Sequence, residues 1–269
     1  MSHFKDPPKK QLGQHFLHDR NVIDKIVLAV NPKPGDALVE IGPGQGAITF
    51  PLLRKHGALT VIEFDRDLIT PLSEAAHGLG ELTIVHKDVL KIDFGKLAGE
   101  GRLRLVGNLP YNISTPILFH VLEHSAAIID MHFMLQKEVV ERMGAAPGSK
   151  VYGRLSVMLQ AVCEVVPLFV VGPEAFRPPP KVDSAVVRLL PKPAESIGIS
   201  DPALFERLVR DAFGQRRKTL RNAIQALCSA EQISAAGLRP ELRAEQLAVA
   251  EFIKLSNYLS GATASADIP

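Results

Sequence analysis

Short apolar runs alternate with helix-like stretches between Ala37 and Gln136. This alternation is typical of β-α units, in which a helix follows each strand and the strands form a parallel sheet. The expected strands cover residues 37–41, 59–63, 83–86, 103–107 and 131–135. Because these runs are continuously apolar, helices must cover both faces of the sheet. The sequence therefore predicts a doubly wound, Rossmann-like α/β domain.

Two further apolar runs, at residues 164–171 and 185–190, are rich in valine and flank a proline-dense segment. β-Branched residues favour strands, and proline is tolerated at the edge of a sheet. We expect the two runs to form an antiparallel pair at the sheet edge.

A change to helical periodicity after Pro193 marks a second, smaller domain. Asp201 is placed to cap a helix whose first turn contains Pro202. Apolar residues follow with helical spacing at Leu204, Phe205, Leu208, Val209 and Phe213. The predicted domains are residues 1–193, which include an N-terminal arm, and an all-helical domain of residues 194–269.

The composition excludes several classes of protein. Hydrophobic residues make up 46% and charged residues 22% of the chain, the balance of an ordinary globular protein. Asp130 and Pro167 interrupt apolar stretches, so no run reaches the ~18 residues that span a bilayer. Cys163 and Cys228 form neither a disulfide pattern nor a metal-binding pattern. We expect a cytoplasmic protein with no metal site and no membrane association.

A glycine-rich turn follows the first expected strand and precedes a helix. Gly42 and Gly44 allow close backbone approach to a ligand at the carboxyl end of the sheet, where doubly wound folds bind nucleotides. Together with Ala47 they also satisfy the dinucleotide pattern G-x-G-x-x-G/A, and Glu63 ends the next strand, where a ribose-binding acid is expected. The turn alone thus leaves a nicotinamide oxidoreductase open.

Acidic residues near three strand ends favour S-adenosylmethionine as the ligand. Glu40 lies two residues before Gly42, where a carboxylate suits ammonium and sulfonium charges and repels a pyrophosphate. Glu63 is placed to bind ribose hydroxyls, and Asp88 to accept a hydrogen bond from an adenine amino group. Taken singly, Glu63 or Asp88 could instead cap the following helix. Together the acids predict one cofactor trough.

The fourth expected strand runs into Asn108, Leu109, Pro110 and Tyr111, which we call the clamp. An adenine amino nitrogen is a poor nucleophile until its geometry becomes tetrahedral, because its lone pair is delocalised into the ring. The Asn108 side-chain oxygen and the Leu109 carbonyl can accept the two amino hydrogens and favour that geometry. Pro110 biases Leu109 toward an extended conformation, and Tyr111 can stack on the extruded base. An ordinary proline turn is the alternative.

A proline-rich segment at residues 176–182 lies between the last two expected strands. Its position predicts a rigid loop in which Phe176 covers the opposite face of the base or the transferred methyl group. The alternatives are a proline-rich peptide ligand for a partner protein and a segment that only separates the two strands.

Basic residues cluster near the start of the helical domain, although the net charge of the whole chain is only +2. Such a cluster can contact nucleic-acid phosphates or simply form a solvated surface. The residues predicted to bind RNA are Arg216, Arg217, Lys218 and Arg221.

Motifs along nearly the whole chain resemble those of the ribosomal RNA adenine dimethyltransferases. They lie at residues 11–17, 40–47, 108–111, 152–156 and 176–182. Residues 176–186 and 213–220 look most like the small-subunit members, which dimethylate two adjacent adenosines in the loop near the 3′ end of 16S rRNA.

This resemblance implies methyl transfer from S-adenosylmethionine to adenine N6 atoms on a precursor of the small ribosomal subunit. We expect a monomeric enzyme. The residues implied in cofactor binding are His15, Leu17, Gly42, Glu63, Asp88 and Asn108, to which the charge argument adds Glu40 and Gly44. The family usually has asparagine where this chain has His15; the main chain there can still contact the cofactor, and a simple surface role for His15 is the alternative.

Three alternatives stay open. A dimethyltransferase that acts on 23S rRNA would share the same clamp chemistry. A non-enzymatic RNA-binding assembly or transcription factor would keep the fold, and a nicotinamide oxidoreductase would use the glycine turn.

Overall fold

The chain divides into two compact units, which differ in part from the predicted domains. The sheet unit comprises Met1–Val140 and Val166–Pro191, and the helical unit comprises Glu141–Val165 and Lys192–Pro269. The computed structural model describes residues 8–9, 12–215 and 217–266. The boundary after Pro191 lies close to the predicted one, but the segment Glu141–Val165 joins the helical unit instead of the α/β domain.

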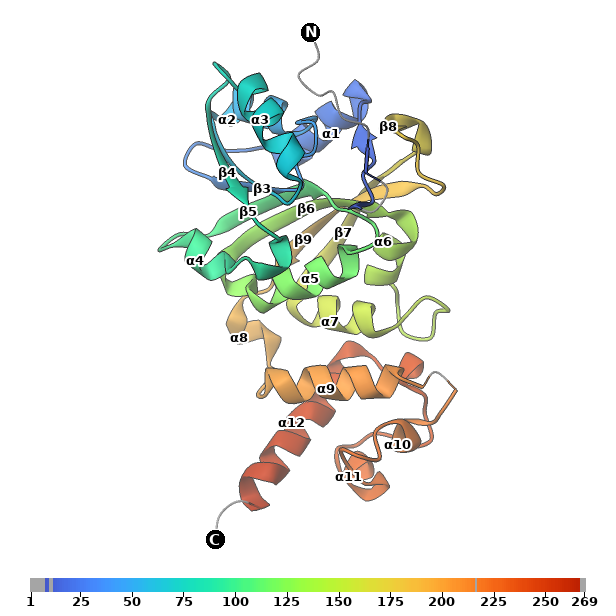
Figure 1. The fold of residues 1–269 in the computed structure, drawn as a ribbon. Coiled ribbons are helices and arrows are strands. Elements are labelled where there is room, and N and C mark those ends of the chain that lie inside the picture. Colours follow the sequence, from blue (N-terminus) through green and yellow to red (C-terminus); the bar gives the residue numbers. More distant parts are fainter. Residues whose placement is uncertain (1–7, 10–11, 216, 267–269) are drawn as a thin grey trace. The chain divides into compact units, whose positions relative to one another are not determined.

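Seven strands form the main sheet, in the order β4-β3-β2-β5-β6-β9-β7 (Figure 1). β2, β3, β4, β5 and β6 pair in parallel, and β9 pairs antiparallel with β6. The two valine-rich runs, β7 and β9, are neighbours at one edge. The predicted doubly wound architecture is confirmed. The strand bounds are β2 Ala37–Ile41, β3 Ala58–Glu63, β4 Glu81–His86, β5 Leu103–Asn108, β6 Ile128–Gln136, β7 Cys163–Val171 and β9 Ser184–Pro191.

Helices cover both faces of this sheet, with α1, α2 and α3 on one side and α4 and α5 on the other (Figure 1). Each buries at least one apolar residue; in α1, for example, Ile23, Ile26 and Val30 are buried. Burying such a side chain contributes about 1.5–3 kcal/mol. The bounds are α1 Arg20–Val30, α2 Thr49–His56, α3 Arg66–Ala75, η2 Val89–Lys91, α4 Phe94–Ala98, α5 Ser114–Glu123, η3 Ser125–Ala127, α6 Lys137–Met143 and η4 Pro173–Ala175.

A small two-stranded sheet ties the N-terminal segment to the proline-rich segment. In it β1 (Phe16–Leu17) pairs antiparallel with β8 (Phe176–Arg177), so that Leu17 lies opposite Phe176. The His18 amide extends the pairing by donating to the Ala175 carbonyl at 2.9 Å. Two segments that are far apart in sequence are thereby held together.

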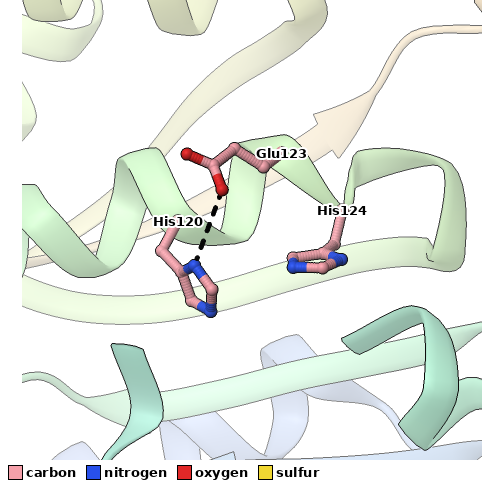
Figure 2. Close-up of side chains that lie close together, drawn as sticks. All are labelled: His120, Glu123 and His124. Carbon is pink, nitrogen blue, oxygen red and sulfur yellow. Dashed lines mark ion pairs between the residues drawn. The ribbon is translucent and has the colours of Figure 1, made fainter. Parts of the chain in front are cut away.

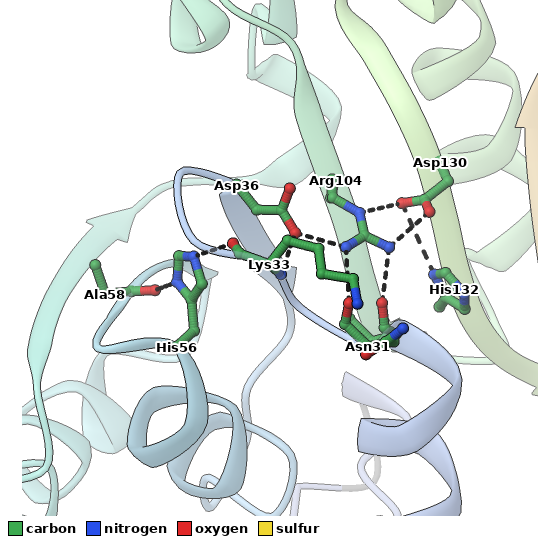
Figure 3. Close-up of polar contacts among 9 residues, drawn as sticks. Asn31, Lys33, Asp36, His56, Ala58, Arg104, Asp130 and His132 are labelled. Carbon is green, nitrogen blue, oxygen red and sulfur yellow. Dashed lines mark hydrogen bonds and ion pairs between the residues drawn. The ribbon is translucent and has the colours of Figure 1, made fainter.

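An ion-pair network lies at the amino-terminal end of β5 (Figure 3). Arg104 donates to both carboxylate oxygens of Asp130, at 2.9 and 2.7 Å, and to Asp36 at 2.6 Å. It also donates to the Val30 carbonyl at 2.7 Å, at the end of α1. His132 lies beside Asp130, and burial lowers the pKa of its imidazole to about 4. Arg104 thus joins β5, β6 and the end of α1 through a largely buried side chain.

The helical unit has a core of its own. Asp201 caps α9 by accepting a hydrogen bond from the Leu204 amide at 3.0 Å, as the sequence predicts. Residues of the segment Glu141–Val165, among them Tyr152 and Val157, pack in the same apolar cluster as Phe205, which explains why this segment belongs here. The helices are α7 Arg154–Val162, α8 Ala194–Ile197, α9 Pro202–Phe213, α10 Leu220–Ala223, α11 Ala230–Ala235, η5 Ala244–Gln246 and α12 Val249–Ala266.

Among the described residues, no helix is both long and apolar enough to cross a membrane.

Candidate active site

A cavity of about 360 Å³ lies in the sheet unit and is lined by residues near the carboxyl ends of β2, β3, β4 and β5. Ligands of doubly wound folds bind at this end of the sheet. The N-terminal segment at residues 12–17 supplies further lining residues. The predicted site residues that line the cavity are His15, Leu17, Glu40, Gly42, Gly44, Glu63, Asp88, Asn108, Leu109, Pro110 and Tyr111.

The glycine turn has the backbone geometry that only glycine adopts readily. Gly42 and Gly44 have φ angles of 68° and 55°, in the left-handed region. A Cβ atom on Gly44 would also lie 3.1 Å from the Phe16 ring. The turn therefore closes against the N-terminal segment, and a larger side chain there would displace Phe16.

Glu40 is fully buried at the end of β2, beneath the glycine turn. Burial raises the pKa of its carboxyl to about 8, while the Thr49 hydroxyl donates to Oε2 at 2.6 Å. At neutral pH the protonated form of Glu40 is therefore favoured. A cation bound in the cavity would favour the ionised form instead.

Glu63 and Asp88 follow at the ends of the next two strands. Burial raises the pKa of Glu63, although its carboxylate accepts hydrogen bonds from the Asp65 amide at 2.7 Å and the Gly44 amide at 3.3 Å. Asp88 accepts a hydrogen bond from the Leu90 amide at 3.0 Å and so caps η2. Asp88 thus lines the cavity and also has the capping role that its sequence position allowed.

The clamp presents two oxygen acceptors at the end of β5. The Asn108 Nδ2 donates to the His15 carbonyl at 3.0 Å, which fixes the orientation of the amide. The Leu109 amide donates to the Met134 carbonyl at 3.1 Å. Within the described part of the chain, neither the Asn108 Oδ1 nor the Leu109 carbonyl accepts a hydrogen bond. Both oxygens are therefore available to an amino group.

Tyr111 is held by its hydroxyl and covered by a histidine. Its hydroxyl lies 2.5 Å from the Ser184 Oγ, and burial raises the pKa of the phenol. The His15 ring stacks on the tyrosine with centroids 5.5 Å apart and an interplanar angle of 23°. The His15 Nδ1 lies 2.8 Å from the Pro178 carbonyl, so His15 connects the clamp to the proline-rich segment. A base must stack on the other face of Tyr111 or displace His15.

Phe176 lies elsewhere than the sequence predicted. It is 1% exposed and is not among the residues that line the cavity. Its pairing with Leu17 places the ring in the apolar cluster that also contains Val171 and Ala175. In this structure Phe176 therefore packs in the core beside the β1–β8 pair and not in the cavity wall, and its contact with a base stays a prediction.

The predicted RNA-binding residues belong to the helical unit. Arg217 and Lys218 precede α10 and are exposed, as is Arg221 within it. Arg216 lies outside the described residues.

Two residues at this site were not singled out from the sequence: Phe64, which lines the cavity, and its neighbour Asp65, which does not. Phe64, directly after Glu63, lines the cavity with a side chain that is 62% exposed, so it is available to contact a flat ring. Asp65 binds Lys9 and Gln14 of the N-terminal segment at 2.6 and 2.8 Å. Burial acts to raise the pKa of Asp65, but these two partners lower it. The only signal for these two residues in the sequence is their position: Phe64 and Asp65 directly follow Glu63 at the end of β3.

Comparisons with known proteins agree with this site. Residues 6–261 match the family model described as "Ribosomal RNA adenine dimethylase". Ribosomal RNA small subunit methyltransferase A of Xanthomonas campestris pv. campestris (strain B100) is 68% identical over 256 residues, which cover 95% of this chain and 98% of the relative.

Solved structures show the same fold. A dimethyladenosine transferase from Plasmodium falciparum superposes with a TM-score of 0.78 and 27% identity, covering 93% of this chain and 98% of the other. The 23S rRNA methyltransferase ErmE superposes with a TM-score of 0.68 and 23% identity, covering 91% and 99%, which supports the fold alone. From the family match and the close relative together, this chain belongs to the ribosomal RNA adenine dimethylase family.

Proposed function

We propose that this protein transfers methyl groups from S-adenosylmethionine to the N6 atoms of two adjacent adenosines near the 3′ end of 16S rRNA. The products are N6,N6-dimethyladenosines, made during maturation of the small ribosomal subunit. The observation that carries the proposal is the clamp: the His15 carbonyl accepts a hydrogen bond from the Asn108 Nδ2 and so orients the amide, and Asn108 and Leu109 both line the cavity. The name of the 68% identical relative supports the small subunit as the substrate.

The residues of the cavity fit S-adenosylmethionine. Three acids line it, and the buried Glu40 is the kind of group whose ionisation a cationic ligand promotes. We assign Glu63 to the ribose hydroxyls, Asp88 to the adenine amino group, and Glu40 with Gly42 and Gly44 to the methionine end. The bound cofactor supplies an electrophilic methyl group.

The clamp needs no strong base. The Asn108 Oδ1 and the Leu109 carbonyl accept the two amino hydrogens of the target adenine and stabilise its tetrahedral geometry. Positive charge develops on the nitrogen during transfer, and these neutral acceptors stabilise it until a proton leaves. Acceptors that are already oriented need no reorganisation during the reaction. The hydrogen bond from Asn108 to the His15 carbonyl contributes to catalysis because it holds the Asn108 amide in one orientation.

Glu40 should make cofactor binding depend on pH. With a pKa of about 8 in the free protein, Glu40 must lose a proton to pair with a cationic ligand, so affinity should rise as pH rises toward 8. We expect about fivefold tighter binding at pH 8 than at pH 7 from this group. Isothermal titration calorimetry of the wild type and Glu40→Gln measures it.

The Glu40→Gln variant keeps an acceptor for Thr49 and serves as the control. The cofactor's own amino group titrates near pH ~8, and the difference between the two pH profiles removes its contribution. Parallel profiles for the two proteins would show that Glu40 does not ionise on binding.

Tyr111→Ala should lower kcat/KM for RNA about 5- to 150-fold, equivalent to losing ~1–3 kcal/mol of base stacking. Tyr111→Phe keeps the ring and removes only the hydroxyl that contacts Ser184, so it should stay close to the wild type. Steady-state methyl transfer to the small subunit measures both. A loss below twofold in the alanine variant would remove Tyr111 from the stacking role.

The exposed basic residues of the helical unit are proposed to contact RNA phosphates. Replacing Arg217, Lys218 and Arg221 with alanine should weaken RNA binding and reduce its dependence on salt, since each phosphate contact releases counterions. Filter binding at several salt concentrations measures the slope. The exposed Lys254 in α12 provides a control substitution, and equal slopes for both variants would contradict the assignment.

The proposed function is tested with radiolabelled S-adenosylmethionine and ribosomal subunits purified from cells that lack each methylation. We expect label in 16S rRNA at two adjacent adenosines, mapped by primer extension, with two methyl groups on each. Label only in 23S rRNA would overturn the choice of substrate. Cofactor binding without transfer to either RNA would favour a non-enzymatic factor, and tight binding of a nicotinamide cofactor alone would favour an oxidoreductase.

Two accessory expectations accompany the proposal. The enzyme should act as a monomer, which sedimentation of the purified protein would show. A cytoplasmic location follows from a ribosomal substrate.

A further inference from the structure

Two histidines and a glutamate gather at the end of α5, and none of them is among the cavity-lining residues. His120, Glu123 and His124 form the pattern H-x-x-E-H, and one potential ligand atom from each lies within 4.8 Å of the others (Figure 2). Residues three and four apart in a helix share a face. The expectation of no metal site considered only the cysteines, so it did not weigh this group.

His120 is oriented as a metal-binding histidine would be. Its Nε2 lies 2.7 Å from the Ile92 carbonyl, which can only accept, so Nε2 carries the hydrogen. Metal-binding histidines commonly donate their other ring N–H to a carbonyl in this way. The Nδ1 lies 3.7 Å from the Glu123 Oε2. In the neutral ring this nitrogen is an acceptor, as is the carboxylate oxygen, so a cation between the two atoms would bind to both.

His124 completes the group. Its ring centroid lies 5.2 Å from that of His120, and its Nδ1 lies 3.8 Å from the Asp93 Oδ1. The Phe94 ring lies 5.8 Å from both imidazoles and forms an apolar wall beside them. The histidine side chains are 17% and 23% exposed, whereas Glu123 is 70% exposed. The group is therefore partly desolvated and still open to an entering ion.

We propose that His120, Glu123 and His124 bind a zinc ion. Two imidazole nitrogens and one carboxylate oxygen suit Zn²⁺, whereas Mg²⁺ and Ca²⁺ prefer oxygen ligands alone. Ligand atoms of a tetrahedral zinc site lie about 3.4 Å apart, so the Nδ1–Oε2 pair needs to move by only a few tenths of an ångström. Small side-chain rotations bring in His124, and water or Asp93 completes the shell.

The ion would stabilise the structure and take no part in methyl transfer. It would join the end of α5, which begins just after the clamp, to the segment Ile92–Phe94. That segment directly follows η2, whose cap is Asp88. Zinc would thus stabilise two segments that follow predicted residues of the cavity in the chain, namely Asp88 and the clamp.

The test is zinc binding by the tag-free full chain after treatment with a chelator, without RNA or cofactor. Competition with a chromophoric zinc indicator and calorimetry give the affinity and stoichiometry. We expect one ion per chain, at least tenfold weaker binding in His120→Gln and in His124→Gln, and a smaller loss in Glu123→Gln. The exposed His77→Gln variant should bind zinc as the wild type does. Co²⁺ in place of zinc should show the intense visible absorption of tetrahedral coordination.

Specific outcomes would overturn the proposal. Absence of stoichiometric binding by the wild type would show that these three side chains do not form a zinc site. Equal zinc affinity in the wild type and His124→Gln would place any bound ion elsewhere. Far-UV circular dichroism checks the fold of each variant, and the exposed Glu123 gives a substitution that should leave the fold intact. Because no step uses RNA or S-adenosylmethionine, failure here is distinct from failure of the proposed function.

Discussion

Asn108→Ala should lower kcat for methyl transfer about 100- to 1000-fold at saturating RNA and cofactor, because removing one preorganised polar group from a transition-state site has an effect of this size. The variant removes the oxygen proposed to accept one amino hydrogen of adenine. It also removes the hydrogen bond to the His15 carbonyl. Single-turnover methyl transfer to small subunits measures the chemical step directly.

The control for Asn108 is Asn21→Ala, an exposed asparagine at the start of α1. It should transfer methyl groups at the wild-type rate. Calorimetry with S-adenosylmethionine separates loss of cofactor binding from loss of catalysis. If Asn108→Ala retained more than about a tenth of the wild-type kcat, the clamp would not stabilise the reacting nitrogen as proposed.

Arg104→Met should lower the free energy of unfolding of the sheet unit by about 3–5 kcal/mol, because it leaves partly buried acids without their partner. Asp130 and Asp36 would both lose Arg104, and the Val30 carbonyl would lose a donor (Figure 3). Methionine fills much of the same volume, so the loss reports mainly on the charge and its hydrogen bonds.

Urea denaturation followed by far-UV circular dichroism measures this loss, since the chain contains no tryptophan. Glu206→Gln is the matched control, because it removes the more exposed ion pair between Glu206 and Arg154. Losing this pair should lower the free energy of unfolding by less than about 1 kcal/mol. Similar losses in both variants would mean that the Arg104 network behaves as a surface ion pair.

The order of strands and helices in the sheet unit could be predicted because hydrophobic periodicity is a local property. The runs at residues 37–41 and 103–107 correspond to β2 and β5, with differences of at most one residue at their ends. The clamp could be identified for a similar reason. Its four residues are contiguous, and a strand end positions them at the edge where ligands bind.

Contacts between distant segments could not be predicted in the same way. Phe176 has the residue type and sequence position of a pocket wall, yet its pairing with Leu17 turns it into the core. His15 and Tyr111 are far apart in sequence, and only the folded chain brings their rings together. Assignment of Glu141–Val165 to the helical unit likewise depends on which apolar faces pack together.

By itself, the sequence determined the doubly wound sheet, the glycine turn, the strand-end acids and the clamp, because each depends on residues close together in the chain. Only the tertiary structure determined the pKa values, orientations and neighbours of the side chains. Burial raises the pKa of Glu40 to about 8, the His15 carbonyl orients Asn108, and α5 brings two histidines toward Glu123. Desolvation and long-range hydrogen bonding depend on what the rest of the chain places around a residue, which local sequence does not contain.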